Sequence, residues 1–355
     1  MNSMGQKSYS HYKTNLFLAF PVILSQAGQI VVVFADNLMV GRLGATQLAA
    51  AAFANSIFLV GLVFGIGVSM AITPIVGAAY GGGKRNKSIR WLKKSLKIYP
   101  YFSIIQSICM ALIVLLFPYL GQSEDVIKLS IPYYLILVAS IFPFQYFLIF
   151  KQYAEGLGNT KIAMFITIFS NLVNIGFNYI LIYGKFGFPA LGLTGAGIAT
   201  LISRVIMPFL FYIAYKKMKL FEPERYFKEK VTITVKSIKR LFNTGIPIGA
   251  QSIVEVLTFS LGSIMMGWIG EKELAAQQIA LSLTSFTFMA VSGLAAATTI
   301  KVSQYNGMND KKNIINTVKA SLVLVIFFMV GSVTAFISLR YQIPKWFVPD
   351  PEVIQ

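Results

Sequence analysis

The amino-acid sequence predicts an all-α polytopic membrane protein with two pseudo-symmetric helical lobes, a six-helix repeat of which the second copy is truncated. Composition supports the membrane class, because 56% of the residues are hydrophobic and only 12% are charged, whereas a soluble domain carries roughly 25% charged residues. Two further observations support this prediction: a series of apolar runs of helix length, and an offset of 226 residues at which the chain matches itself.

Nine apolar runs are long enough to cross a bilayer, for which a helix needs about 20 residues. They fall at 15–40, 47–80, 98–120, 130–150, 160–183, 192–215, 242–268, 274–300 and 318–339. The first run is bracketed by Lys13 and Arg42. It is too long for the apolar core of a signal peptide and shows no convincing small-residue cleavage site, so we expect it to be retained as a helix.

Lysine and arginine alternate between the segments that separate these runs. If alternate segments are grouped together, the group that includes the N-terminus carries 24 lysines and arginines, and the other group carries 6. Basic residues mark the cytoplasmic side of a membrane protein, so we expect a multi-pass protein with a cytoplasmic N-terminus. The net charge of +18 is then a signal of topology, and we expect no nucleic-acid partner.

The internal repeat runs without a gap. Pro21 falls on Pro247, and further matches occur at the same offset: Met39 and Met265, Gly41 and Gly267, Gly67 and Gly293, Thr73 and Thr299, Gly81 and Gly307. Both copies begin on the same side, and parallel repeats of this kind enclose the substrate site of transporters. We therefore expect an N-lobe at 1–215 with helices 1–6, a basic cytoplasmic linker at 216–240, and a partial C-lobe at 241–355 with helices 7–9 and the approach to helix 10.

A second lobe equal to the first would need three more helices than the sequence holds. The chain stops at 350–355, after a WFVP segment that we interpret as an interfacial exit. We expect a truncated chain, and a genuinely asymmetric nine-span protein is the alternative.

Two carboxylates lie within the apolar runs, Asp36 and Glu255, and we place the other eleven acidic residues in loops or tails. A charged side chain inside a span costs roughly 2.5–3.5 kcal/mol on insertion scales. A chain retains such a residue where a positive partner comes and goes beside it. Asp36 is therefore our candidate for the coupling carboxylate of a cation-driven membrane transporter.

Four further positions share the depth of Asp36 in the outer half of the membrane. Asn174 and Asn178 lie on one face of the fifth span, and Ala196 and Thr200 lie in the outer half of the sixth. Hard cations such as Na⁺ or Mg²⁺ bind oxygen ligands of this kind, whereas a proton could use Asp36 alone. The alternative for the amides and the hydroxyl is hydrogen bonding between helices, worth about 0.6 kcal/mol each.

Glu255 lies near the middle of the seventh span, and its repeat counterpart is Gln29. A second cation or a cationic substrate could bind it, or it could be a protonated side chain bonded to a neighbouring helix. Arg204 in the sixth span could pair with a carboxylate. We expect it instead to extend along its stem towards the inner surface.

Other chemistry is not indicated. The single cysteine, Cys109, excludes a disulfide framework, and the only histidine, His11, precedes the first span. GGGK at 81–84 does not fit a phosphate-binding loop, because the residue after Lys84 is Arg85 rather than Ser or Thr. We expect a protein that is not an enzyme and carries no cofactor.

Several segments together resemble the multidrug and toxic compound extrusion (MATE) transporters, and most of all their bacterial NorM-like branch. They are FADNLMVGRLGATQLAA, GIGVSMAITPIVGAAYGGGK, EGLGNTKIAM, NIGFNYILIYGKFGFPALGLTGAGIAT and ELAAQQIALSL. The resemblance covers essentially the whole chain. It implies twelve helices in two six-helix lobes around a central cleft, and Na⁺- or H⁺-driven export of cationic and aromatic drugs across the bacterial plasma (inner) membrane.

The resemblance also implies roles for particular residues. The N-lobe cation site would comprise Asp36, Asn174, Asn178, Thr200 and the Ala196 carbonyl, with Na⁺ as the possible metal, and Glu255 would be the acid of the seventh helix. A tenth-helix acid of this branch would lie beyond the end of the chain. We expect a monomer whose partners are membrane lipid and small cationic or aromatic substrates.

Two other functions stay open from the sequence. A lipid-linked oligosaccharide flippase of the same superfamily should have a cationic cleft for a pyrophosphate, whereas the two in-span acids favour a cation. A channel or a structural membrane protein explains neither those acids nor the repeat.

Overall fold

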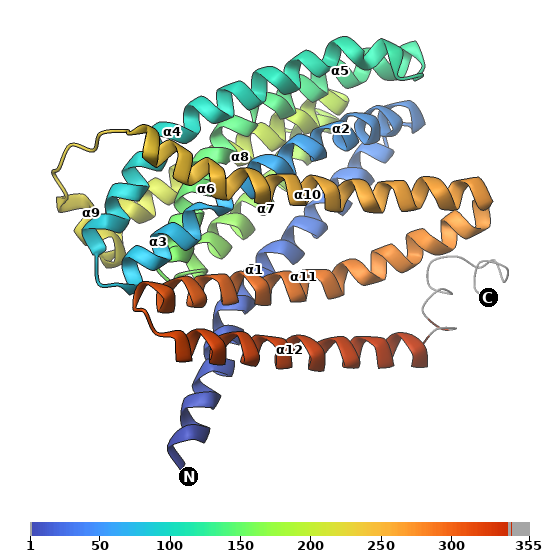
Figure 1. The fold of residues 1–355 in the computed structure, drawn as a ribbon. Coiled ribbons are helices and arrows are strands. Elements are labelled where there is room, and N and C mark those ends of the chain that lie inside the picture. Colours follow the sequence, from blue (N-terminus) through green and yellow to red (C-terminus); the bar gives the residue numbers. More distant parts are fainter. Residues whose placement is uncertain (1, 340–341, 343–355) are drawn as a thin grey trace.

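The protein is a bundle in which most of the long helices run back and forth roughly along one axis, with their turns gathered at two ends, while the first helix crosses obliquely (Figure 1). This computed structural model describes residues 2–339 and 342. The α-helices are α1 (Asn2–Gly41), α2 (Ala45–Met70), α3 (Ile72–Gly81), α4 (Arg85–Leu112), α5 (Glu124–Ala139), α6 (Ile141–Gly156), α7 (Lys161–Tyr183), α8 (Gly192–Lys217), α9 (Glu222–Tyr226), α10 (Val235–Ile269), α11 (Glu271–Gly307) and α12 (Lys311–Ser338). Two 3₁₀ helices, η1 (Ile113–Tyr119) and η2 (Lys219–Phe221), complete the described elements.

Nine segments within the described residues are long and apolar enough to span a membrane, which confirms the predicted number. Two of them are interrupted helices. The second span is α2 followed by α3, which meet at Ala71, and the fourth is α5 followed by α6, which meet at Ser140. The predicted tail at 350–355, with its WFVP segment and the approach to a tenth helix, lies outside the described residues.

Helix ends follow the local sequence. The Asp310 side chain accepts a hydrogen bond from the Asn313 backbone N–H (3.0 Å) at the start of α12. This satisfies one of the donors that a helix N-terminus leaves unpaired. Gly184 ends α7 in the left-handed conformation (φ 67°), which glycine adopts without a steric penalty. Its Cα faces the Ala190 backbone, so that α8 returns directly alongside α7.

The core of the first six spans is filled by two clusters of buried apolar side chains. One lies between α3, α4, α6 and α8 and contains Tyr99, Phe147, Tyr153 and Phe211. The other lies between α2, α5 and the start of α8 and contains Phe58, Tyr134 and Ala196. A third, smaller cluster joins α1 to α11 through Leu18, Ala19, Leu294, Ala297 and Ile300.

One end of the bundle carries the two most basic segments, residues 84–97 and 216–240, and we call it the basic end. The predicted loop at 81–97 is mostly helix, because α4 begins at Arg85 rather than near 98. The first turns of α4 hold the linker at several points. Arg90 pairs with Glu229 (2.8 Å), and Lys93 and Lys97 donate to linker carbonyls at Phe227 and Val231.

The last three described spans pack on the first six through backbone contacts near the basic end. A Cβ placed on Gly81 would overlap the Gln304 carbonyl, and one placed on Gly307 would overlap the Ala78 carbonyl. At the 226-residue offset, 81 becomes 307 and 78 becomes 304. The two contacts are therefore equivalents exchanged by an approximate two-fold axis, as in an isologous interface. Gly77 faces Ser303, which is its own counterpart at the same offset.

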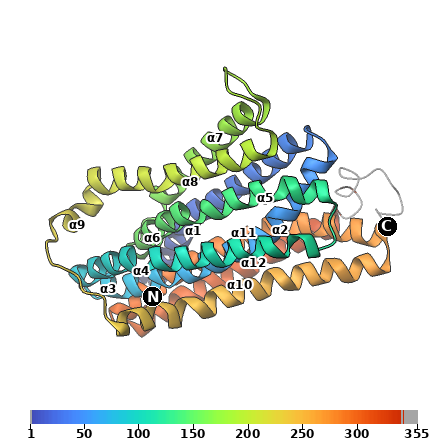
Figure 2. The same ribbon diagram turned by 90° about the horizontal axis from the view of Figure 1, so that it is seen from above.

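A second pair of contacts obeys the same offset. A Cβ on Gly67 of α2 would lie 2.5 Å from the Cα of Gly249 in α10, and one on Gly293 of α11 would overlap Ile23 of α1. Seen from above, α10 runs along one edge of the molecule, and α7 and α8 lie along the other (Figure 2).

One of the acidic residues assigned to loops or tails is buried within a spanning helix. Glu155 is part of α6, and only 5% of its surface is exposed. Its assignment to a loop was wrong because α6 continues six residues beyond the apolar run that ends at 150. The nearest cation is Lys151, one turn earlier on the same helix, at 3.9 Å.

Candidate functional site

Hydrogen bonds connect Asp36 to three of the four positions predicted to share its depth. Asn178 Nδ2 donates to Asp36 Oδ1 and also to Asn174 Oδ1 (3.2 Å). Asn174 Nδ2 in turn donates to Thr200 Oγ1 (3.4 Å). The chain of contacts crosses from α1 through α7 to α8, so three helices meet at one polar point.

The helices bring these side chains together for local reasons. Asn174 and Asn178 are four residues apart on α7 and therefore lie on one face, and both are buried at 3% and 0% exposure. The backbones of α7 and α8 approach closely, because a Cβ on Gly195 would lie 2.6 Å from the Leu181 carbonyl oxygen. Asn171, one turn earlier on α7, faces Gly28 of α1 rather than the Asp36 carboxylate.

The Asp36 site contains an acceptor without a partner. Asn178 Oδ1 is buried and has no hydrogen-bond partner in the described structure, since its amide nitrogen serves both Asp36 and Asn174. An unpaired buried acceptor costs on the order of 1–3 kcal/mol. A cation beside Asp36 would supply the missing positive partner.

The chemistry of the Asp36 site suits a monovalent cation. Its donors are one carboxylate, two amides and one hydroxyl, all of which offer oxygen. No group of three His, Cys, Asp or Glu side chains able to hold a metal occurs among the described residues. A transition-metal centre of that type is therefore absent from this part of the chain.

The two remaining predicted positions lie apart from this hydrogen-bonded chain. Ala196 is buried at 3% exposure, one turn from Thr200 on α8, where its methyl group packs in the apolar cluster of α2 and α5. Glu255 is half-buried on α10, a helix that packs on α2 and α11. Within the described residues, Glu255 has no hydrogen bond or ion pair.

Arg204 lies inside the bundle, and the expectation that it extends to the inner surface was wrong. Its Nη1 donates to Ser140 Oγ (2.8 Å) at the buried break between α5 and α6. Its guanidinium also lies over the rings of Phe58 and Phe144, 5.1 and 4.9 Å from their centroids. These inward partners fix the long side chain, so it does not follow the usual route to the interface.

Sequence reasoning missed other polar side chains in the same interior. Tyr133 donates to Asn55 (3.3 Å), and Gln145 donates to Gln106 (3.2 Å). The available signal was the presence of amides and a phenol inside apolar runs. The hydropathy of a run does not say which of its polar residues face one another.

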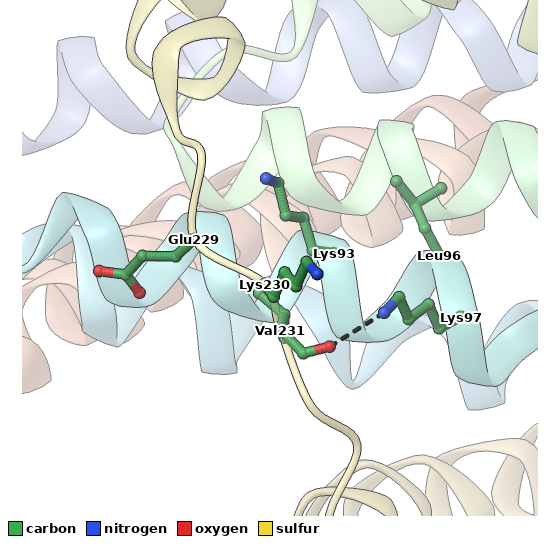
Figure 3. Close-up of a pocket in the computed structure, with 6 residues that line it drawn as sticks. All are labelled: Lys93, Leu96, Lys97, Glu229, Lys230 and Val231. Carbon is green, nitrogen blue, oxygen red and sulfur yellow. Dashed lines mark hydrogen bonds between the residues drawn. The ribbon is translucent and has the colours of Figure 1, made fainter.

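A cavity of about 320 Å³ lies at the basic end (Figure 3). It is lined by Lys93, Leu96, Lys97, Glu229, Lys230 and Val231. Lys93 and Lys97 already donate to linker carbonyls. The cavity lies between α4 and the linker residues that are hydrogen-bonded to α4. None of the predicted site residues lines it.

Comparison with known proteins identifies the family. The MatE family model matches residues 21–180 and 247–355, two segments that begin at the repeat offset of this chain. The chain belongs to the MatE family. A MatE protein with these nine spans is a multi-pass membrane protein, and its relatives place it in the bacterial NorM-like branch.

Curated MatE relatives are similar over nearly the whole chain. A probable multidrug resistance protein NorM from Agrobacterium fabrum is 30% identical over 97% of this chain and 74% of its own length. One of the same name from Mannheimia succiniciproducens is 33% identical over 96% of this chain and 74% of its own length.

Solved MATE structures share the fold. A mutant of the Vibrio cholerae MATE transporter VcmN superposes with a TM-score of 0.89 at 18% identity, covering 99% of this chain and 78% of that one. A MOP-superfamily transporter from Pyrococcus furiosus superposes with a TM-score of 0.81 at 20% identity, covering 97% and 76%.

Proposed function

We propose that this MatE protein is a cation-coupled antiporter that exports cationic and aromatic compounds, multidrug substrates among them, in exchange for Na⁺ or H⁺. The observation that carries the proposal is the half-buried carboxylate of Asp36, which is hydrogen-bonded to Asn178 beside that residue's unpaired amide oxygen. The names of the NorM relatives support the substrate class.

We place the basic end in the cytoplasm of a bacterial cell, at the inner membrane. The support is the excess of lysine and arginine at that end, which follows the positive-inside rule. The N-terminus is then cytoplasmic. Spans one to six act as one lobe and spans seven to nine as part of a second lobe.

In this mechanism the coupling cation is a substrate that completes the Asp36 site. Asp36 and Asn178 Oδ1 receive it, and Thr200 Oγ1 supplies a further oxygen from α8. Bound between α1 and the pair α7–α8, the cation draws the outer part of α1 towards the lobe. Release of the cation leaves the Asp36 carboxylate without its positive partner. A cationic substrate is bound by the second acid, Glu255.

Transport by the full-length protein in proteoliposomes tests the proposal. Ethidium efflux is followed with a Na⁺ gradient and a pH gradient imposed separately. We expect one gradient to drive efflux and Asp36→Asn to abolish it. Glu124→Gln, which neutralises an exposed acid at the start of α5, is the matched control and should transport normally. Gradient-driven efflux by Asp36→Asn at the native rate would refute the coupling role.

A further inference from the structure

Arg204 is a half-buried cation that points into the bundle and has no carboxylate partner. In the described part of the chain no Asp or Glu oxygen lies within ion-pair distance of its guanidinium, whose partners are a hydroxyl and two aromatic faces. A guanidinium has five donors and stays charged in proteins. Burying one charge without an opposite charge is costly, so its placement calls for an explanation.

The Arg204 guanidinium occupies the same lobe as the candidate coupling site. It is four residues from Thr200 on α8, one turn or roughly 6 Å along the helix axis. Thr200 is in turn joined to Asp36 by hydrogen bonds through Asn174 and Asn178. The hydrogen bond to Ser140 and the rings of Phe58 and Phe144 hold the guanidinium back from direct contact.

We infer that Arg204 is a fixed internal counter-charge that sets how tightly the Asp36 site binds its coupling cation. The inference rests on the proposed function. Between cycles Asp36 is compensated at a distance by a permanent positive charge, which lowers the cost of an empty site. When the cation arrives, the same charge repels it, so the site binds weakly enough to release it.

The size of the effect follows from electrostatics. As an order-of-magnitude case, two unit charges with about 10 Å between them, in a protein medium of effective dielectric about 20, alter a binding constant on the order of tenfold. An Arg204→Gln variant should therefore bind the coupling cation about ten times more tightly than the native protein. Arg204→Lys, which keeps the charge, should differ from native by about twofold at most.

The test is cation binding by the purified full-length protein, independent of transport. Na⁺ is titrated at constant ionic strength and followed by thermal stabilisation. In Na⁺-free buffer, protonation is followed by the infrared carboxyl band that Asp36→Asn removes. For the ion that binds, Arg204→Gln should lower the half-saturating concentration about tenfold. Unchanged or weaker binding by this variant would overturn the inference.

A second variant covers the case in which Arg204→Gln does not fold. Ser140→Asp places a carboxylate at the atom that now accepts the guanidinium hydrogen bond, and so neutralises the charge without removing the side chain. It should tighten cation binding to a similar degree, whereas Ser140→Ala should not. If the native protein shows no Asp36-dependent binding of either ion, the proposed function fails. If it does bind and neither neutralising variant tightens binding, only the role of Arg204 fails.

Discussion

Replacing Gly81 with alanine should open the contact between α3 and α11. A Cβ at this position would lie 2.6 Å from the Gln304 Cα and 2.6 Å from its carbonyl carbon, and would overlap the oxygen. These are backbone atoms, so no side-chain rotation relieves the overlap, and the helices would have to separate by about 1 Å to reach ordinary contact. Overpacking of this kind costs about 1–3 kcal/mol.

This overpacking destabilises only the conformation in which α3 and α11 are in contact. If the lobes exchange between a form with this contact and a form without it, about 1–3 kcal/mol shifts the balance by roughly 5- to 150-fold towards separation. The assay labels a reporter cysteine at Ser303, which faces Gly77 in the same interface, with a maleimide in detergent-solubilised protein. The natural Cys109 is exposed and is replaced by alanine beforehand.

We expect Gly81→Ala to raise the rate of labelling at Ser303→Cys by at least fivefold. The matched control is Gly176→Ala on α7, where a Cβ would meet nothing within 4 Å. This change should leave labelling unaltered and stabilise α7 by up to about 1 kcal/mol. Equal labelling rates in the two variants would refute the close-packed interface and the reasoning built on it.

Three further predictions concern the linker and the Asp36 site. Glu224→Ala removes a fully buried carboxylate that is bonded to Arg85 (2.6 Å) and to Tyr153 (2.5 Å). It should lower the free energy of unfolding by about 3–5 kcal/mol in thermal denaturation. A loss under about 1 kcal/mol would contradict the buried ion pair. Asn178→Ala should weaken Na⁺ or H⁺ binding in the same titrations used for Arg204 variants, and unaltered affinity would remove the amide from the site. The hydrogen bond from Arg90 holds the pKa of Glu229 below its usual value. The Arg90–Glu229 pair is therefore fully formed above about pH 5 and is lost as the pH falls through the lowered pKa. Hydrogen exchange of the linker amides should rise only in that acidic range.

The spans and the repeat were predictable because both depend on composition along the chain. Hydropathy predicts the membrane segments, and the alternation of basic residues predicts on which side of the membrane each connecting segment lies. The offset that relates Gly81 to Gly307 was visible in the sequence, and the structure turns it into two equivalent contacts. The breaks at Ala71 and Ser140 carried a signal that the hydropathy pattern did not reveal, because a proline, Pro74 or Pro143, lies three residues after each of them. A proline has no N–H to donate to the carbonyl four residues earlier, which is where α2 and α5 end.

The sequence predicted at which level along the helices the site residues lie, but not which way the Arg204 side chain points. Residue spacing placed Asp36, Asn178 and Thr200 at one level, and they are joined by hydrogen bonds through Asn174. Arg204 was misplaced because a long side chain in the middle of a helix, such as α8, can extend along the helix or point inward. That choice depends on Ser140 and the two rings of other helices, which one-dimensional spacing does not reveal.

The role of α1 connects the Asp36 site with the glycine contacts. Its C-terminal half carries Asp36 against α7, and its N-terminal half carries Ala19 and Ile23 against Gly293 of α11. The two points are about 13 residues apart, roughly 20 Å along one helix. A cation that alters how α1 packs on α7 therefore acts on a helix that also packs against α11 at Gly293. The Gly293 contact involves the flexible Ile23 side chain, whereas the Gly81 and Gly307 contacts are made with backbone carbonyls. The latter cannot yield by small side-chain adjustments and are suited to two discrete states, intact or separated.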